Sequence, residues 1–228
     1  IPASFEPTLD YVVTKMARFP FDKFALASNK LSTQMKATGE VMSIGRTIEE
    51  SLLKAVRSLE VGAYRLHLKK FDDVGTSELL EYIKSGRDDR IFAIAELIRR
   101  HTDLGVIANE TQIDMLFLDK IKNITDEETA LRNARFDAEE LRCAKRMGFS
   151  DRAVSDFWDC TEEEIYNFRA ENKILPVYKM IDTCAAEFDG YIPYFYSSYE
   201  EENESDVSDG KKIIVLGSGP IRIGQGVE

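Results

Sequence analysis

The chain has 228 residues, and its 43% hydrophobic and 10% aromatic content is enough for a packed core, which argues against disorder. The formal net charge of −11 would repel phosphate backbones, so nucleic acid is not an expected partner. No apolar run approaches the ~20 residues of a membrane-spanning helix and no secretory pattern is present, so we expect a cytoplasmic protein without membrane contact.

The N-terminal part of the chain predicts short extended segments. Residues 10–19 (DYVVTKMARF) are rich in β-branched side chains and alternate loosely, as a strand with one face in water would. Residues 40–43 form a second short extended or turn segment between Gly39 and Gly45. We therefore expect residues 1–46 to be the end of a domain that begins upstream.

Residues 47–175 have a helical pattern that starts with a capping signal. Thr47 and Glu50 have the spacing of a capping box, in which a hydroxyl and a carboxylate satisfy backbone N–H groups at a helix start. The same spacing recurs at Thr125 with Glu128 and at Thr161 with Glu164. Each pair predicts the first turn of a helix.

Apolar residues recur at helical spacing after these signals and predict a buried face on several helices. The stripes are Leu52, Leu53, Val56 and Leu59; Ile91, Ile94, Ala95 and Ile98; Ile113, Leu116, Phe117 and Ile121; and Ala134, Ala138, Leu141 and Ala144. Lys145 and Arg146 suit the negative end of the last helix, and Gly148 is a stop signal. We predict a compact, mainly α-helical domain of six to eight short helices, flanked by short α/β pieces.

Beyond Pro176 the helical period is lost. Aromatic residues crowd residues 191–199, and the acidic residues 200–209 are typical of a solvated linker. Residues 213–216 (IIVL) then meet the glycine-rich residues 217–226, a pattern that predicts a buried parallel strand opening onto a ligand-facing loop. Because such a unit needs a further helix and strand, we expect the chain to be a piece of a longer protein.

Candidate catalytic and metal-binding residues are few. His67 and His101 lie in no recognisable motif, and we interpret each as a surface or helix-end residue. Cys143, Cys160 and Cys184 are an odd number without a C-x-x-C spacing, which indicates a reducing compartment and no zinc site.

Two segments partly resemble a DNA-binding helix-turn-helix and a dinucleotide-binding glycine motif, but neither matches. Residues 147–173 have a helix-turn-helix layout, but the second helix would carry four glutamates and one arginine, which the DNA would repel. In the glycine-rich segment Arg222 occupies the place of a third glycine, so a nicotinamide-type fingerprint is not predicted.

Five blocks of the sequence together resemble the large subunit of carbamoyl phosphate synthetase. They are residues 4–19 (SFEPTLDYVVTKMARF), 35–60 (MKATGEVMSIGRTIEESLLKAVRSLE), 176–188 (PVYKMIDTCAAEF), 196–204 (YSSYEEENE) and 212–228 (KIIVLGSGPIRIGQGVE). They occur in the family's order and with its approximate separations. The helical middle, residues 61–175, is similar to the family in length and texture.

The resemblance implies an ATP-dependent ligase that serves arginine and pyrimidine biosynthesis. Such a parent makes carbamoyl phosphate from bicarbonate, two ATP and ammonia, using Mg²⁺ or Mn²⁺. The ammonia comes from glutamine, hydrolysed by an amidotransferase that is a separate small subunit or a fused domain. Two homologous ATP-grasp halves are joined by an α-helical domain that contributes to self-association, so the chain's other expected partner is a second copy of itself.

On this resemblance the chain divides into three parts. Residues 1–59 would end the first, carboxyphosphate half; residues 60–210 would be the helical oligomerisation domain with its acidic linker; and residues 211–228 would open the carbamoyl phosphate half. The family's ATP and metal ligands fall outside these residues. We therefore expect no catalytic, cofactor-binding or metal-binding residue here, and an inactive fragment.

Two residues match positions that the family uses in the wall of its carbamate tunnel, Glu40 and Gly226. Glycine gives clearance because it has no side chain. A glutamate in such a passage needs hydrogen bonds or a cationic neighbour to stay charged, and Arg46 is one candidate nearby in the sequence. Two other functions stay open: a stand-alone nucleotide-binding module, and a helical regulatory interaction module with no enzyme parent.

Overall fold

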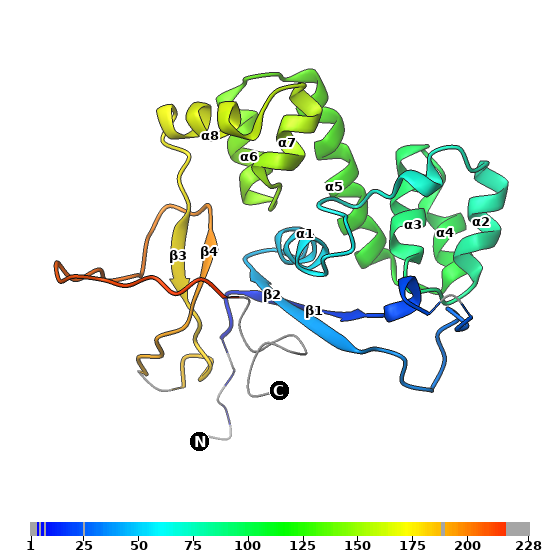
Figure 1. Cartoon of the computed structure of the whole chain (residues 1–228), viewed down its shortest axis with the longest axis horizontal. Coiled ribbons are helices and arrows are strands. Elements are labelled where there is room, and N and C mark those ends of the chain that lie inside the picture. Colours follow the sequence, from blue (N-terminus) through cyan, green and yellow to red (C-terminus); the bar gives the residue numbers. More distant parts are fainter. Residues whose placement is uncertain (1–3, 5, 7, 25, 188–189, 218–228) are drawn as a thin grey trace.

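The computed structural model describes residues 4, 6, 8–24, 26–187 and 190–217 (Figure 1). In these residues eight α-helices form the body of the molecule, and a two-stranded sheet precedes and another follows them in the chain. The prediction of a mainly α-helical domain with six to eight helices and short flanking pieces is confirmed. Of the described helices, none combines the length and apolarity needed to cross a bilayer.

The first sheet pairs the two segments expected to be extended. β1 (Val12–Arg18) and β2 (Gly39–Gly45) are antiparallel, with Val12 opposite Gly45 and Arg18 opposite Gly39. The short 3-10 helix η1 (Pro20–Asp22) follows β1. Alternate residues of β2 are buried because one face of the strand packs on α1 (Ile48–Ser58), where Val41 meets Ala55 and Leu59.

The helical body is organised around one long helix. The elements after α1 are η2 (Lys69–Phe71), α2 (Thr76–Lys84), α3 (Arg90–Arg99), α4 (Leu104–Thr111), α5 (Met115–Asn133), α6 (Ala138–Arg146), α7 (Asp151–Trp158) and α8 (Glu162–Glu171). Helix α5 contacts α1, α3, α4, α6 and α7, with α2–α4 on one side of it and α6–α8 at its other end in Figure 1. One cluster of buried apolar side chains runs through all of these helices.

Trp158 shows how α7 is held against α5. Its side chain is 1% exposed, lies beside Phe168 and Phe136, and donates a hydrogen bond from Nε1 to the carbonyl oxygen of Leu131 at 2.8 Å. A buried indole N–H needs such a partner, since an unsatisfied donor would cost about 1–3 kcal/mol. This contact therefore locks α7 against the C-terminal half of α5.

The three predicted capping boxes have three different outcomes. Thr161 and Glu164 form the complete box at the start of α8. Thr47 accepts from the Glu50 N–H at 3.1 Å, but the Glu50 carboxylate accepts from the backbone N–H of Arg46 at 2.7 Å, so only half of that box forms. The third prediction, at residues 125–128, is wrong because both residues lie inside α5, where the helix is continuous.

The predicted stripe at the start of α5 is also corrected. Ile113 precedes the helix, and Leu116 and Phe117 are 51% and 52% exposed. Ile121 is buried as expected, and the remaining buried apolar positions of α5 are Leu118, Ile124 and Leu131. The stripe fails at its first turn because α5 enters the core only at Leu118.

The other stripes hold, with one adjustment. α3 buries Ile94, Ala95 and Ile98, as predicted. In α6 the apolar face begins at Ala138, because Ala134 is the C-cap of α5 rather than a part of α6. Gly148 ends α6 at a φ of +96°, a conformation that glycine adopts without a steric penalty.

The second sheet follows the helical body. β3 (Val177–Met180) and β4 (Phe195–Ser198) are antiparallel, and β4 contacts β2 of the first sheet. The acidic segment after β4 is partly anchored, because Glu204 accepts from Lys179 Nζ at 2.9 Å and from the Met180 N–H at 2.7 Å.

The strand predicted at residues 213–216 does not form. Ile213 and Leu216 are 92% and 91% exposed, and none of the described strands pairs with this segment. A parallel strand is stable only between partners, and the described chain supplies none for it. Residues 218–226 of the glycine-rich motif, including Gly226, lie outside the described residues.

Candidate functional site

The first turn of α5 presents large apolar side chains to water. Asp114 starts the helix by accepting from the Leu116 N–H at 2.8 Å. Met115, Leu116 and Phe117 then follow with 42%, 51% and 52% exposure. We call these three residues the apolar turn. Clustered exposed apolar residues, unlike single ones, are typical of surfaces that contact another molecule.

An apolar groove of about 270 Å³ lies beside the apolar turn, between α1, α3 and α5. Its apolar lining consists of Ile48, Leu52, Ile91, Ile94, Ile113, Phe117 and Ile121. Phe117 belongs to both features. Turn and groove together offer a surface that protrudes and a hollow that accepts apolar side chains, which suits contact with a protein partner.

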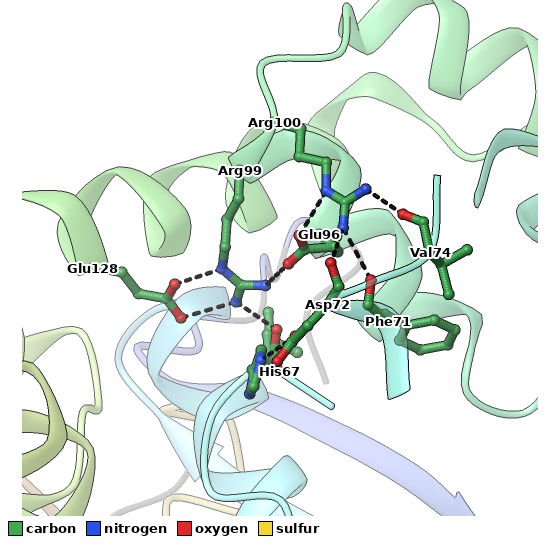
Figure 2. Close-up of polar contacts among 9 residues, drawn as sticks. His67, Phe71, Asp72, Val74, Glu96, Arg99, Arg100 and Glu128 are labelled. Atoms are coloured by element: carbon green, nitrogen blue, oxygen red, sulfur yellow. Dashed lines mark hydrogen bonds and ion pairs between the residues drawn. The ribbon is translucent and has the colours of Figure 1, made fainter. Parts of the chain in front are cut away.

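A network of arginines and carboxylates holds the other side of α3 (Figure 2). Arg99 binds Glu128 of α5 through two parallel hydrogen bonds, Nε to Oε2 at 2.6 Å and Nη2 to Oε1 at 3.0 Å. Its Nη1 donates to Glu96 at 3.3 Å, and its Nη2 also donates to the Leu66 carbonyl. Burial opposes the charge of Arg99, but the Glu128 carboxylate raises the pKa of the guanidinium above its usual value.

Arg100 fixes the segment between α1 and α2 through backbone carbonyls. Its Nη2 donates to Phe71 O at 2.9 Å and to Asp72 O at 3.0 Å, its Nη1 donates to Val74 O, and its Nε donates to Glu96 at 2.8 Å (Figure 2). These bonds satisfy backbone carbonyl groups at the end of η2 and in the turn that follows it. The network therefore has a structural role, which is to hold α3, α5 and the long connection as one body.

Glu40 lies in β2 opposite Ala17, with its side chain 54% exposed. Its carboxylate pairs with Lys15 Nζ at 2.9 Å. The two residues are diagonal neighbours on one face of the sheet, because Lys15 stands opposite Met42. A cation therefore accompanies the glutamate, and it is supplied by the neighbouring strand.

The expectation that Arg46 would be this cation is wrong. Arg46 pairs instead with Asp10 at 2.5 Å. The reason is the geometry of β2: Glu40 and Arg46 are six residues apart along an extended strand, which separates their backbones by about 20 Å. Gly226, the other tunnel candidate, lies outside the described residues.

The histidines and cysteines are dispersed. His101 follows the C-terminal end of α3 at a φ of +58°, as the helix-end interpretation predicted. His67 instead lies in the connection before η2, with Nε2 2.7 Å from Asp72 Oδ1. Cys143, Cys160 and Cys184 are free thiols. Within the described residues, no group of three or more His, Cys, Asp or Glu side chains is placed to hold a metal ion.

The chain is thus a mostly helical domain between two small sheets, with an apolar turn and groove on its surface. Compared with known protein families, residues 40–173 match the family described as carbamoyl-phosphate synthetase large chain, oligomerisation domain. The match covers more than half of the 228 residues, so the chain belongs to this family. The alternative of a helical module with no enzyme parent is thereby set aside.

Proposed function

We propose that this chain is the self-association and linker region of its parent enzyme, and that the apolar turn and groove form the contact with a second copy. The observation that carries the proposal is the exposure of Met115, Leu116 and Phe117 beside a groove in which seven of the ten lining residues are apolar. In a symmetric contact each copy can insert its turn into the groove of the other. Burial of the three side chains would then supply the driving force.

The parent, on this proposal, is the cytoplasmic ligase that makes carbamoyl phosphate from bicarbonate, two ATP and glutamine-derived ammonia. ATP, Mg²⁺ or Mn²⁺ and the amidotransferase would bind to other parts of the parent, and the chain itself would be non-catalytic. Residues 1–59, 60–210 and 211–228 would belong to the first half, the oligomerisation domain and the second half. Membership of the large-chain family supports this assignment.

Phe117→Glu tests the proposed contact. The charge would have to be buried in the groove of the partner, so we expect the dissociation constant of the dimer to rise by at least about a hundredfold. Light scattering after size-exclusion chromatography measures the change. Tyr166→Glu on α8, where the tyrosine is 53% exposed, is the matched control and should associate as the native chain does. Equal association of both variants would rule out this surface.

We further propose that Glu40 and Gly226 line a passage for the carbamate intermediate. Glu40 is supported by its position in the sequence block that resembles the family, and by its 2.9 Å ion pair with Lys15 on the neighbouring strand. In the full-length parent, Gly226→Phe should abolish carbamoyl phosphate synthesis while bicarbonate-dependent ATP hydrolysis continues. Gly226→Ala, a smaller change, should retain part of the synthesis. Normal synthesis in the Phe variant would show that Gly226 does not line the passage.

A further inference from the structure

A polar cavity of about 270 Å³ lies where α1, the turn before α7, and the second sheet meet. Charged and hydroxyl side chains dominate its lining, which includes Glu50, Lys54, Arg57, Lys145, Asp151 and Tyr199. Three of these residues are cations and two are carboxylates. A fourth cation, Arg169, binds Asp151 from behind at 2.9 Å. The cluster therefore carries an excess of two positive charges in a chain whose net charge is −11.

Most of these charges are paired. Lys54 Nζ pairs with Glu50 at 2.7 Å and donates to the carbonyl oxygens of Ile44 and Ser197. All three of its N–H bonds are therefore used. Glu50 is 1% exposed, and its carboxylate also accepts from the Arg46 N–H at 2.7 Å and from Ser198 Oγ at 3.4 Å.

The ion pair between Lys145 and Asp151 leaves one N–H donor of the lysine free. Lys145 is 4% exposed, and its Nζ donates to Phe149 O and to Asp151 Oδ1, both at 2.8 Å. Its ammonium also lies 4.9 Å from the centre of the Tyr199 ring. Since Asp151 is shared with Arg169, one carboxylate faces two cations at this point.

Arg57 is the cation without a counter-ion. Its Nη1 donates to the Gly148 carbonyl at 2.7 Å, and within the described chain no carboxylate forms an ion pair with it. Burial lowers the pKa of the Arg57 guanidinium, although Glu50 acts in the opposite direction. A guanidinium has five N–H donors in a planar fork, and a buried one is stabilised by an oxyanion that accepts two of them.

Two neutral features of the cavity also favour an anion. The Tyr199 hydroxyl has no hydrogen bond to any other described residue and can donate into the cavity. The N-terminus of α7, capped by Ser150, brings the positive end of a helix dipole to the same place. Both add to the excess charge of the side chains.

We propose that this cavity binds a phosphate-class oxyanion, held by the Arg57 fork with Lys145 and Tyr199. The excess of two positive charges suits phosphate, which carries between one and two negative charges near neutral pH, and the volume is too small for a nucleotide. The ligand would join α1, α6 and the residue that follows β4, and so fasten the helical body to the second sheet. This site is separate from the apolar turn and groove.

Titration calorimetry of the chain with inorganic phosphate, in chloride medium of constant ionic strength, tests the proposal. We expect a dissociation constant below about 1 mM, and at least tenfold weaker binding by Arg57→Gln, because a charge-assisted bidentate contact is lost. Arg132→Gln removes the same charge from an exposed position over the Phe157 ring and should bind phosphate normally. A parallel titration with methyl phosphate distinguishes free phosphate from a phosphorylated metabolite as the ligand. Tighter binding of methyl phosphate than of phosphate indicates a phosphorylated metabolite.

A second, milder variant tests the site in case Arg57→Gln does not fold. Tyr199→Phe removes only the hydroxyl, so it should keep the native circular dichroism spectrum and weaken phosphate binding about threefold to tenfold. Absence of phosphate binding by the folded native chain would overturn the proposal. Equal binding by the native chain, Arg57→Gln and Tyr199→Phe would also overturn it, because the anion would then bind elsewhere.

Discussion

Arg99 and Glu128 form a largely buried, bidentate ion pair between α3 and α5. The Glu128 side chain is 2% exposed, and among the described residues Arg99 is its bidentate partner. Arg99→Met would leave a buried carboxylate without its cation, which costs about 3–5 kcal/mol of unfolding free energy. Urea unfolding followed by circular dichroism measures this loss.

The matched controls for this pair are a double and a surface variant. Arg99→Met with Glu128→Leu removes both charges and should recover most of the lost stability, since a well-packed apolar pair can replace a buried ion pair. Arg142→Met breaks a 3.9 Å pair with Glu139, whose side chain is 86% exposed, and should change stability by less than about 0.5 kcal/mol. A loss below about 1 kcal/mol in Arg99→Met would contradict the role assigned to the network.

At the scale of elements, α5 and α6 meet at two carboxyl groups. Oε1 of Glu127 and Oε1 of Glu140 are both buried and have no hydrogen-bond partner among the described residues. Burial, followed by repulsion from Glu140, raises the pKa of Glu127 to about 7. The folded chain therefore binds more protons than the unfolded chain between pH 4.5 and about 7, and this group lowers stability as the pH rises through that window.

Glu127→Gln should remove this pH-dependent penalty. We expect the free energy of unfolding of the variant to equal that of the native chain near pH 4.5. At pH 7.5 it should be larger by about 1–2 kcal/mol, after allowance for solvent screening. Urea unfolding at several pH values measures the difference. Glu139→Gln, at a neighbouring position that is 86% exposed, should show no such divergence. A difference that stays constant with pH would exclude the titration of Glu127 as the cause.

Elements defined by local patterns could be predicted from the sequence. The apolar stripe of α3 and the box at Thr161 depend only on neighbours three or four residues apart, and both are present. The same spacing at Thr125 and Glu128 gave a wrong helix start, because a threonine and a glutamate can have this separation inside a helix as well as at its start. Glu128 was consequently missed as the partner of Arg99, although its place within a run of buried α5 positions was a usable signal.

Features that depend on distant segments could not be predicted in the same way. The cation beside Glu40 comes from β1, and only the strand register identifies it as Lys15. The exposure of Phe117 depends on where α5 meets the core, which periodicity does not determine. Residues 213–216 have a strand-like sequence, but pairing needs partners that the described chain does not provide.

At the scale of the whole molecule, the chain is a helical body with both sheets attached to it. α1 packs on the first sheet, and β4 of the second sheet contacts β2 of the first (Figure 1). Lys54 of α1 adds a direct link, because its ammonium donates to β2 at Ile44 and to β4 at Ser197. Helix α1 is therefore in direct contact with both flanking sheets.

The proposed function depends on self-association of the chain through its helical body. Sedimentation equilibrium of the native chain over a wide concentration range tests it most directly. We predict an average mass that rises reversibly with concentration from the monomer to a dimer or a higher closed oligomer. A mass that stays at that of the monomer at every concentration would contradict the claim.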